Sequence, residues 1–269
     1  MICKPHHCLS ADSFIFEKQQ NLSIPLHVHA CFEVIAVTEG NMTVQLDAKS
    51  YALEKGDAIF IFPYQVHSIL TEGNCAYTLC IFSNRVISLF ARNYSGKIPQ
   101  DPVVHFWEHP IFETFTACQN QEDILKVKGI LYLFFAELTE QTSFTEDRRQ
   151  NNSDLRLFDR VFPYIEQHYT NKCSLMDAAR ELKYDYTYLS RVFSDFLGIP
   201  FHKYVINLRI SDACYFLKNT QDTILEISQE CGFSSLRSFN RNFSQFMNMT
   251  PSAYRTAQQS LSLERRTVQ

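Results

Sequence analysis

The 269-residue chain lacks several features that would place it in a specialised class. It contains only 7 glycines while 45% of its residues are hydrophobic, which excludes a disordered chain and favours packed domains. No apolar run approaches the roughly 20 residues that a membrane span needs, so we expect no membrane segment. The length fits two domains of ordinary size.

The cysteines also lack a pattern. There are nine of them, with no CxxC pair and no regular spacing. An odd and irregular set, in a chain with no recognisable signal peptide, favours reduced thiols over a disulfide framework. We therefore expect a cytoplasmic protein.

The second half of the chain has little net positive charge. Residues 151–269 contain 14 Lys and Arg against 12 Asp and Glu, a net charge of +2, whereas residues 1–150 contain 11 against 17, a net charge of −6. A charge of +2 attracts DNA weakly, because counterion release scales with the number of phosphates neutralised. DNA binding by the second half would therefore need specific contacts or the joining of two chains.

Two stretches in the second half repeat one another. Residues 179–204 and 228–254 carry the same apolar skeleton, and in the second copy Phe239, Phe243 and Phe246 form one apolar stripe at helical spacing. Each copy predicts a short helix, a tight turn and a second helix, and two helix-turn-helix units in one chain indicate DNA binding. Helical hairpins with aromatic stripes also occur in proteins that never bind nucleic acid, so the pattern alone leaves both interpretations open.

A family resemblance extends through both copies. Residues 174–255 resemble the DNA-binding domain of the AraC/XylS family of bacterial transcription regulators, including the GFSS turn at Gly232 and the closing TPSAYR that begins at Thr250. The chain departs from the family where FSQ, beginning at Phe243, replaces a Phe-Lys-Lys run, and where Asn248 replaces a glycine. Asn tolerates a positive φ better than other non-glycine residues, so we expect this turn to keep its shape. The matching segments are SLMDAARELKYDYTYLSRVFSDFLGIPFHKYVINLRISDACYFL and ILEISQECGFSSLRSFNRNFSQFMNMTPSAYR.

The resemblance implies that the second helix of each unit enters the major groove of double-stranded promoter DNA. Arginine suits the O6 and N7 atoms of guanine, and asparagine suits the N6 and N7 atoms of adenine. An ion pair with Asp195, one helical turn further on, is an alternative use of Arg191. The candidate DNA-contacting residues are Tyr186, Thr187, Ser190 and Arg191 in the first unit, and Ser235, Arg237, Asn240 and Arg241 in the second.

The first part of the chain predicts strands. Short β-branched or aromatic runs are separated by turn signals at residues 39–41 and 54–56. Several short strands in succession favour a sandwich or a barrel. The predicted strands cover residues 32–37, 41–46, 57–62 and 77–82.

A possible ligand site lies among these strands. His27 and His29 are two residues apart and would share one face of a strand, Glu33 follows, and strand pairing could bring His67 beside them. The pattern resembles the HxH, Glu and later His of the cupin barrel, and three imidazoles with a carboxylate suit Zn, Fe, Mn or Ni. AraC-type sensory domains commonly retain this signature while binding an organic effector.

Residues 63–67 lack the PxG spacing of cupin metal enzymes, so we assign no cofactor. Effector binding, metal binding and a purely structural role stay open. The candidate effector-binding residues are His27, His29, Glu33, Tyr64 and His67, with Phe32, Phe60 and Phe62 nearby on one face or the other; a metal, if present, would use His27, His29, Glu33 and His67. The resemblance makes a sugar or a related metabolite the leading candidate for the effector.

Residues 124–138 predict an apolar helix that must bury its apolar side in its own domain or against a partner. The family resemblance implies a homodimer through this helix, with Leu131, Phe134, Phe135 and Leu138 as the candidate interface. Residues 141–153, QTSFTEDRRQNNS, are polar and predict a linker.

The sequence therefore predicts a two-domain α+β protein. An N-terminal cupin-like β-barrel with appended helices (1–140) is followed by the linker (141–153), an all-α domain of about seven helices with two helix-turn-helix units (154–258), and a tail (259–269). A long helix over residues 201–217 joins the two units. The resemblance implies a ligand-responsive regulator without enzymatic activity, acting as an activator with RNA polymerase as a further partner. A metal-dependent cupin enzyme fused to a DNA-binding domain and a protein-interaction adaptor are the alternatives.

Overall fold

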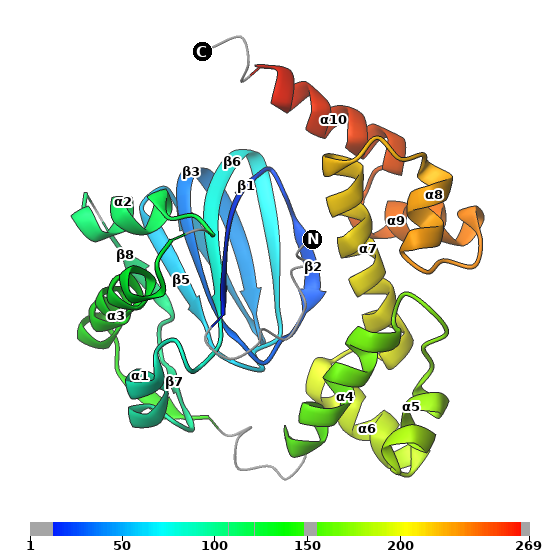
Figure 1. Ribbon diagram of the computed structural model, residues 1–269, viewed down its shortest axis with the longest axis horizontal. Coiled ribbons are helices and arrows are strands. Elements are labelled where there is room, and N and C mark those ends of the chain that lie inside the picture. Colours follow the sequence, from blue (N-terminus) through cyan, green and yellow to red (C-terminus); the bar gives the residue numbers. More distant parts are fainter. Residues whose placement is uncertain (1–12, 107, 121, 148–154, 265–269) are drawn as a thin grey trace. The chain divides into compact units, whose positions relative to one another are not determined.

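The computed structural model describes residues 13–106, 108–120, 122–147 and 155–264 (Figure 1). The chain forms two compact units, and along the sequence the main division between them falls between Leu157 and Phe158, while residues 25–27 of a short strand group with the C-terminal unit. Apart from these three residues, the described strands and the first three helices belong to the N-terminal unit, which runs from blue to green in Figure 1. The C-terminal unit consists of helices, as the sequence predicts.

Seven strands form one sheet in the N-terminal unit. They are β1 (Phe14–Gln20), β2 (Ile24–His27), β3 (Phe32–Leu46), β4 (Lys49–Glu54), β5 (Asp57–Ile61), β6 (His67–Phe82) and β8 (Val103–His105). The order is β1-β6-β3-β5-β8, while β2 pairs with β6 and β4 with β3. This confirms the sheet-rich domain; among the described strands no pair joins β1 to β8, so the hydrogen bonding does not itself close a barrel.

The turn predicted at residues 39–41 is a β-bulge instead. Strand β3 continues through it, and its pairing with β6 changes register on both sides of Glu39. Gly40 has a φ of 68°, and a Cβ atom there would overlap the carbonyl of Asn74. A bulge adds a residue to one strand and bends it without ending the pairing, which explains why a turn-like sequence lies within a long strand. The predicted turn before Asp57 is present between β4 and β5.

The sheet buries both of its faces, because successive side chains of a strand point to opposite sides. On one face Val34 lies between Phe60 and Cys80 of the neighbouring strands, and these residues pack with the helices. On the other face Glu33 lies between Ile61 and Ile81. The helices on the first face are α1 (Ser88–Asn93), α2 (Pro110–Ala117) and α3 (Ile124–Gln141), as Figure 1 shows.

Helix α3 directs the predicted dimer interface into the core. The ring of Phe135 lies 5.0 Å from that of Phe60 and 5.8 Å from that of Phe32, measured between ring centroids. Of the two placements that the sequence left open, the structure shows burial in the same domain, and this corrects the predicted partner face. The four residues concerned are Leu131, Phe134, Phe135 and Leu138, each at most 1% exposed.

The segment predicted as a linker begins with structured residues. Strand β9 (Phe144–Glu146) pairs with β7 (Lys97–Pro99), and the N–H of Asp147 donates to the carbonyl of Gly96 at 2.7 Å. Polar composition alone does not separate a short strand at the edge of a domain from a linker, which explains the difference. The rest of the predicted linker, residues 148–153, lies outside the described residues.

The C-terminal unit contains seven described helices, in agreement with the prediction. They are α4 (Leu155–His168), α5 (Leu175–Leu182), α6 (Tyr186–Leu197), α7 (Phe201–Asn219), α8 (Ile224–Glu230), α9 (Leu236–Met247) and α10 (Pro251–Glu264). Helix α7 is the predicted connection between the two helix-turn-helix units, and α10 continues into the segment predicted as a tail. None of the helices in the described ranges combines the length and the apolar character that a membrane crossing requires. The seven cysteines that the structure describes are free thiols.

Candidate functional site

Equivalent N-terminal caps begin the helices of both helix-turn-helix units. The side chains of Ser174 and Thr223 accept hydrogen bonds from backbone N–H groups at the starts of α5 and α8. Asp185 and Ser235 do the same for α6 and α9. Each cap satisfies an N–H group that the first helical turn leaves without an intrahelical partner. The repeat seen in the apolar residues therefore extends to the residues that start each helix.

The turns and the helix ends of the two units share left-handed residues at equivalent positions. Lys183 and Gly232 follow the first helix of each unit with φ values of 61° and 80°, and both are left-handed. Gly198 and Asn248 end the second helix of each unit with φ values of 68° and 53°. Asn248 thus adopts the left-handed turn expected of it. The turns differ in length, because residues 183–185 connect α5 to α6 whereas residues 231–235 connect α8 to α9.

Helix α7 links the end of α4 to the turn of the second unit. The guanidinium of Arg209 donates to the carbonyls of Tyr169 at 2.6 Å and Asn171 at 2.8 Å, and it lies 5.7 Å from the ring centre of Phe233. The hydroxyl of Tyr169 donates to Asp212 at 2.5 Å. Burial, with the nearby Asp212 carboxylate, raises the pKa of Tyr169 far above its usual range, so the phenol keeps its proton. These contacts hold the second unit in a fixed position on the connecting helix.

The second helix of each unit buries one side and exposes the other. Leu189 and Phe193 of α6, like Phe239 and Phe243 of α9, are in the core. Seven of the eight candidate DNA-contacting residues are exposed, and Ser190 is half-buried. Sequence reasoning therefore placed these residues on the surface, although Ser235 also serves as the cap of α9. The exposed residues are Tyr186, Thr187, Arg191, Ser235, Arg237, Asn240 and Arg241.

The three arginines among these exposed residues are available to contact DNA. Within the described ranges, Arg191, Arg237 and Arg241 form no ion pair. The guanidinium of Arg191 lies 6.0 Å from the ring centre of Tyr188, so the alternative pair with Asp195 is not formed. Three exposed cations on two equivalent helices can therefore reach phosphates or base edges.

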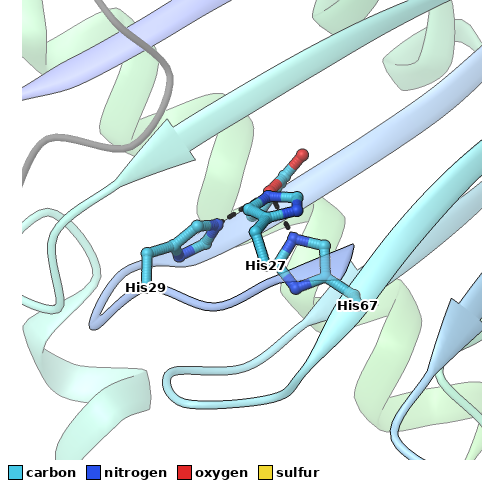
Figure 2. Close-up of side chains that lie close together, drawn as sticks. His27, His29 and His67 are labelled. Carbon is cyan, nitrogen blue, oxygen red and sulfur yellow. Dashed lines mark hydrogen bonds and ion pairs between the residues drawn. The ribbon is translucent and has the colours of Figure 1, made fainter. Parts of the chain in front are cut away.

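A second group of functional side chains lies on the sheet face opposite the helices. His27 ends β2, His29 follows in the connection to β3, Glu33 is in β3, and His67 begins β6. All four are buried, and one nitrogen or oxygen of each lies within 4.8 Å of those of the others. Figure 2 shows the imidazoles of His27, His29 and His67 converging on one point. The structure therefore brings together the four residues that the sequence singled out, with His29 just beyond the strand rather than within it.

The backbone fixes the orientation of all three imidazoles. The Nδ1 atoms of His27, His29 and His67 lie 2.8, 3.1 and 2.8 Å from backbone carbonyl oxygens two residues away in the sequence. A carbonyl oxygen can only accept, so each Nδ1 carries a proton and donates it. In the neutral ring the lone pair then lies on Nε2, the other nitrogen.

Two of these Nε2 atoms face one carboxylate oxygen. The Oε2 atom of Glu33 lies 2.9 Å from Nε2 of His29 and 3.2 Å from Nε2 of His67. Burial by itself would raise the pKa of Glu33, but the hydrogen bonds and charges of the two imidazoles hold it well below its usual range. A carboxylate and a neutral Nε2 are both acceptors, so each of these two contacts needs a shared proton or a metal ion between the two atoms.

The loop before β6 is held by two residues that sequence reasoning did not find. The side chain of Gln65 accepts from the N–H of Phe62 at 2.8 Å and donates to Asp47 at 3.0 Å. Asp47, with a φ of 52°, also accepts from the N–H of Val66 at 3.1 Å. These bonds fix the backbone that leads into His67. An Asp at a tight turn indicates only the turn in a sequence, not its contact with a distant loop.

Tyr64, a candidate effector-binding residue, is joined to the group through its backbone. It lies in the same loop with a φ of 65°, and its N–H donates to the carbonyl of His29 at 2.9 Å. The hydrogen bond links the loop before β6 to the segment that follows β2.

The three phenylalanines expected near this group, on one face of the sheet or the other, lie on the face that packs against the helices. Phe32, Phe60 and Phe62 belong to the core between the sheet and the helices. The side chains beside Glu33 on its own face are aliphatic, because the register places Ile61 and Ile81 next to it on the neighbouring strands. The alternation of the strands, rather than closeness in sequence, decides which side chains share a face with the histidines.

Both units match protein families with related functions. The helix-turn-helix domain model covers residues 178–257, and the AraC-like ligand binding domain model covers residues 11–144. The uncharacterized HTH-type transcriptional regulator SACOL0084 of Staphylococcus aureus (strain COL) is 37% identical over 95 residues, which are 35% of this chain. The chain spans only 13% of the length of that relative. The uncharacterized HTH-type transcriptional regulator YdeC of Bacillus subtilis (strain 168) is 23% identical over 260 residues, 88% of each chain.

A solved structure is similar to this chain over nearly its whole length. ToxT from Vibrio cholerae O395 superposes with a TM-score of 0.61 at 17% identity, covering 91% of this chain and 98% of ToxT. Another structure of ToxT contains a bound unsaturated fatty acid. The two family models follow one another in the order that the sequence predicts, and the fold extends over both. The chain therefore belongs to the AraC/XylS family of transcription regulators.

Proposed function

We propose that this protein is a ligand-responsive DNA-binding transcription regulator, in which the N-terminal unit binds an effector and the C-terminal unit binds promoter DNA. The observation that carries the proposal is the pair of equivalent helices α6 and α9, each with a buried apolar side and an exposed polar side. The proposal assigns no catalytic reaction to the chain.

The exposed side of α9 has the residue types that read base edges. Asn240 and Arg241 are adjacent and exposed, and each bidentate contact of such a residue with its base contributes roughly 1–3 kcal/mol of discrimination. In α6 Arg191 takes the position equivalent to Arg241, and Tyr186, at the start of the same helix, is 44% exposed. Two such helices joined by α7 could enter successive major grooves of one duplex.

The effector site in this proposal is the sheet face that carries His27, His29, Glu33 and His67. Polar groups beside aliphatic side chains are suited to a small molecule with both polar and apolar parts. A sugar, whose hydroxyls such groups could bind, is one candidate. The neighbouring Ile61 and Ile81 favour a ligand with an oxygen-bearing head and an apolar body, a class that includes the fatty acid bound by ToxT.

We further propose that the chain acts as a homodimer through the exposed side of α3. Because Leu131 and its neighbours are in the core, the large apolar residues on the surface of α3 are Leu125, 75% exposed, and Leu133, 57% exposed. Gly129 lies between them at helical spacing with open space around its Cα, which allows close approach of a second helix. Joining two chains raises the effective concentration of the second DNA-binding domain to roughly the millimolar range and offsets the weak positive charge.

The test begins by selecting sites from a library of random DNA duplexes with the purified full chain. The selected duplex and a scrambled duplex of the same composition are then compared in mobility-shift assays over a range of salt concentrations. We expect the chain to prefer the selected duplex, with an affinity that falls steeply as salt rises. In Arg241→Ala the preference should shrink by about 5-fold or more, which corresponds to the lower limit for one base contact.

Arg92→Ala is the matched control, because it removes the same charge from α1 in the N-terminal unit. It should leave both affinities unchanged. If the library yields no preferred sequence, or if Arg241→Ala and Arg92→Ala behave alike, the proposed DNA contact is wrong. Transcription in vitro with RNA polymerase from a template bearing the selected site then tests activation, the direction of control that we propose.

A further inference from the structure

The side chains of His27, His29, Glu33 and His67 form a buried group whose ligand atoms face one another and whose imidazole rings are held in fixed orientations. From its geometry we infer that these four side chains bind one divalent first-row transition-metal ion. The inference rests on the proposed function in one respect, the location of the effector site. Metal binding itself can be measured without DNA.

The donor set is the first support. Three imidazole nitrogens and a carboxylate oxygen are ligands that Zn²⁺, Fe²⁺, Co²⁺, Ni²⁺ and Mn²⁺ accept, whereas Ca²⁺ and Mg²⁺ prefer oxygen alone. All four side chains are at most 4% exposed, so the ion would be bound away from bulk water. Four protein ligands complete a tetrahedral site, and an expanded coordination shell would leave a position for an oxygen of the effector.

The distances are the second support. Ligands about 2.1 Å from one metal ion, at angles between tetrahedral and right, lie roughly 3.0–3.4 Å apart. The two contacts of Glu33 Oε2, 2.9 Å to His29 and 3.2 Å to His67, are close to this range. The largest separation in the group, within 4.8 Å, exceeds the upper end of this range by about 1.4 Å, so the side chains would have to move closer together around one ion.

The third support is the way the rings are held. Histidines that bind metals usually donate their other ring N–H to a carbonyl or carboxylate, which fixes the tautomer and the ring orientation. Here all three rings donate Nδ1–H to the backbone, so the same nitrogen of each ring is left with the lone pair. Asp47 and Gln65 in turn hold the loop that carries His67.

The experiment uses the purified full chain after treatment with EDTA and dialysis into metal-free buffer. Calorimetric titration with Zn²⁺ should show one ion bound per chain, and Co²⁺ should give visible d–d absorption that Zn²⁺ displaces. Glu33→Gln and His67→Gln should each weaken Zn²⁺ binding at least about tenfold. His202→Gln, an exposed histidine of α7, is the matched control and should bind like the wild type.

Circular dichroism of each metal-free variant shows whether it is folded, and the titration of the wild type tests the inference without any variant. The inference is overturned if the folded wild type binds neither ion, or if folded Glu33→Gln binds as tightly as His202→Gln. A mobility shift with the selected duplex, with and without Zn²⁺, separates this inference from the proposed function. If the chain binds the selected duplex in a salt-sensitive way but binds no metal, the metal site is wrong and the proposed function stands. If it binds a metal but shows no sequence preference, the proposed function is wrong and the metal site stands.

Discussion

Gly232 lies so close to the backbone of Thr170 that a Cβ atom on Gly232 would overlap the Thr170 carbonyl. The turn of the second helix-turn-helix unit is thus packed directly against the end of α4. Lys183, at the equivalent turn of the first unit, has a similar left-handed φ but carries a side chain. Both units therefore have a left-handed residue at this position. Only the second unit requires a glycine there, because the Thr170 backbone leaves no room for a Cβ atom.

This difference predicts that substitution destabilises the protein at Gly232 but has little effect at the equivalent position, Lys183. Gly232→Ala should lower the free energy of unfolding by about 2 kcal/mol or more, because strain at a positive φ adds to overlap with the backbone. Lys183→Gly should change it by less than about 1 kcal/mol, because relief of φ strain offsets the greater entropy of the unfolded chain. Chemical denaturation followed by circular dichroism measures both. Equal stability of Gly232→Ala and the wild type would contradict the packing described here.

We expect helices α6 and α9 to contribute independently to DNA specificity. Arg191→Ala and Arg241→Ala should each flatten the base preference at a different position of the selected site, by roughly 1–3 kcal/mol. Because the two side chains are on different helices of separate units, the double variant should lose the sum of the two effects. Binding measured against duplexes with every base at each position gives the answer. Loss of preference at the same position in both variants would show that the helices do not read separate sites.

The sequence predicted the histidine site because its signal is local. His27, His29 and Glu33 are close together in the chain, and their spacing alone indicates a shared face. His67 could be added because a sheet brings successive strands together, and the structure does so by pairing it with Leu46. Asp47 could not be predicted as a support of this site, because its role depends on a contact between two loops that no local pattern encodes.

Helix α3 shows a second limit of the sequence. A helix with apolar residues on nearly all sides does not indicate which side faces its own core. Leu131 and Leu133 have the same hydrophobicity, yet the first is completely buried and the second is 57% exposed. Only the position of the sheet decides between them. The same holds for Gly40, whose turn-like neighbours lie within a strand because the facing strand approaches it closely.

The cap of α8 predicts a pH dependence. The backbone N–H of Thr223 donates to Glu226 at 2.7 Å and its hydroxyl donates at 2.8 Å, and these bonds hold the pKa of Glu226 below its usual value. The folded-state pKa is thus lower than the unfolded value of about 4.3. The stabilisation is therefore fully present above about pH 4.3 and is lost as the pH falls through the folded-state pKa.

Glu226→Gln should make stability less dependent on acid. Glutamine can still accept the hydrogen bonds of the capping box but does not titrate. The loss of unfolding free energy between neutral pH and about pH 3 should be smaller in this variant than in the wild type. Glu230→Gln, at the end of the same helix, should keep the wild-type dependence. Denaturation curves over this pH range measure the difference, and identical curves for the two variants would exclude the cap as its source.

The exposed side of α3 predicts the oligomeric state. Leu125 and Leu133 project from the same side of α3 as Gly129, so replacing both leucines with glutamate should place repelling charges in the proposed dimer interface. Light scattering should then show a monomer where the wild type is a dimer at micromolar concentration. The fold should survive, because neither side chain belongs to the core. The affinity for a two-site duplex should fall by about 10²-fold, since the second DNA-binding domain is no longer tethered.

Leu131→Ala is the contrasting variant on the same helix, because its side chain is completely buried. It should lower the free energy of unfolding by about 2–5 kcal/mol through the cavity that it creates, while the folded protein remains a dimer. The two variants thus separate the surface of α3 from its core. A monomeric wild type would refute the dimer outright. A dimer that persists in the double glutamate variant would place the interface on another part of the chain, because two charges in a close helical contact could not be accommodated without loss of affinity.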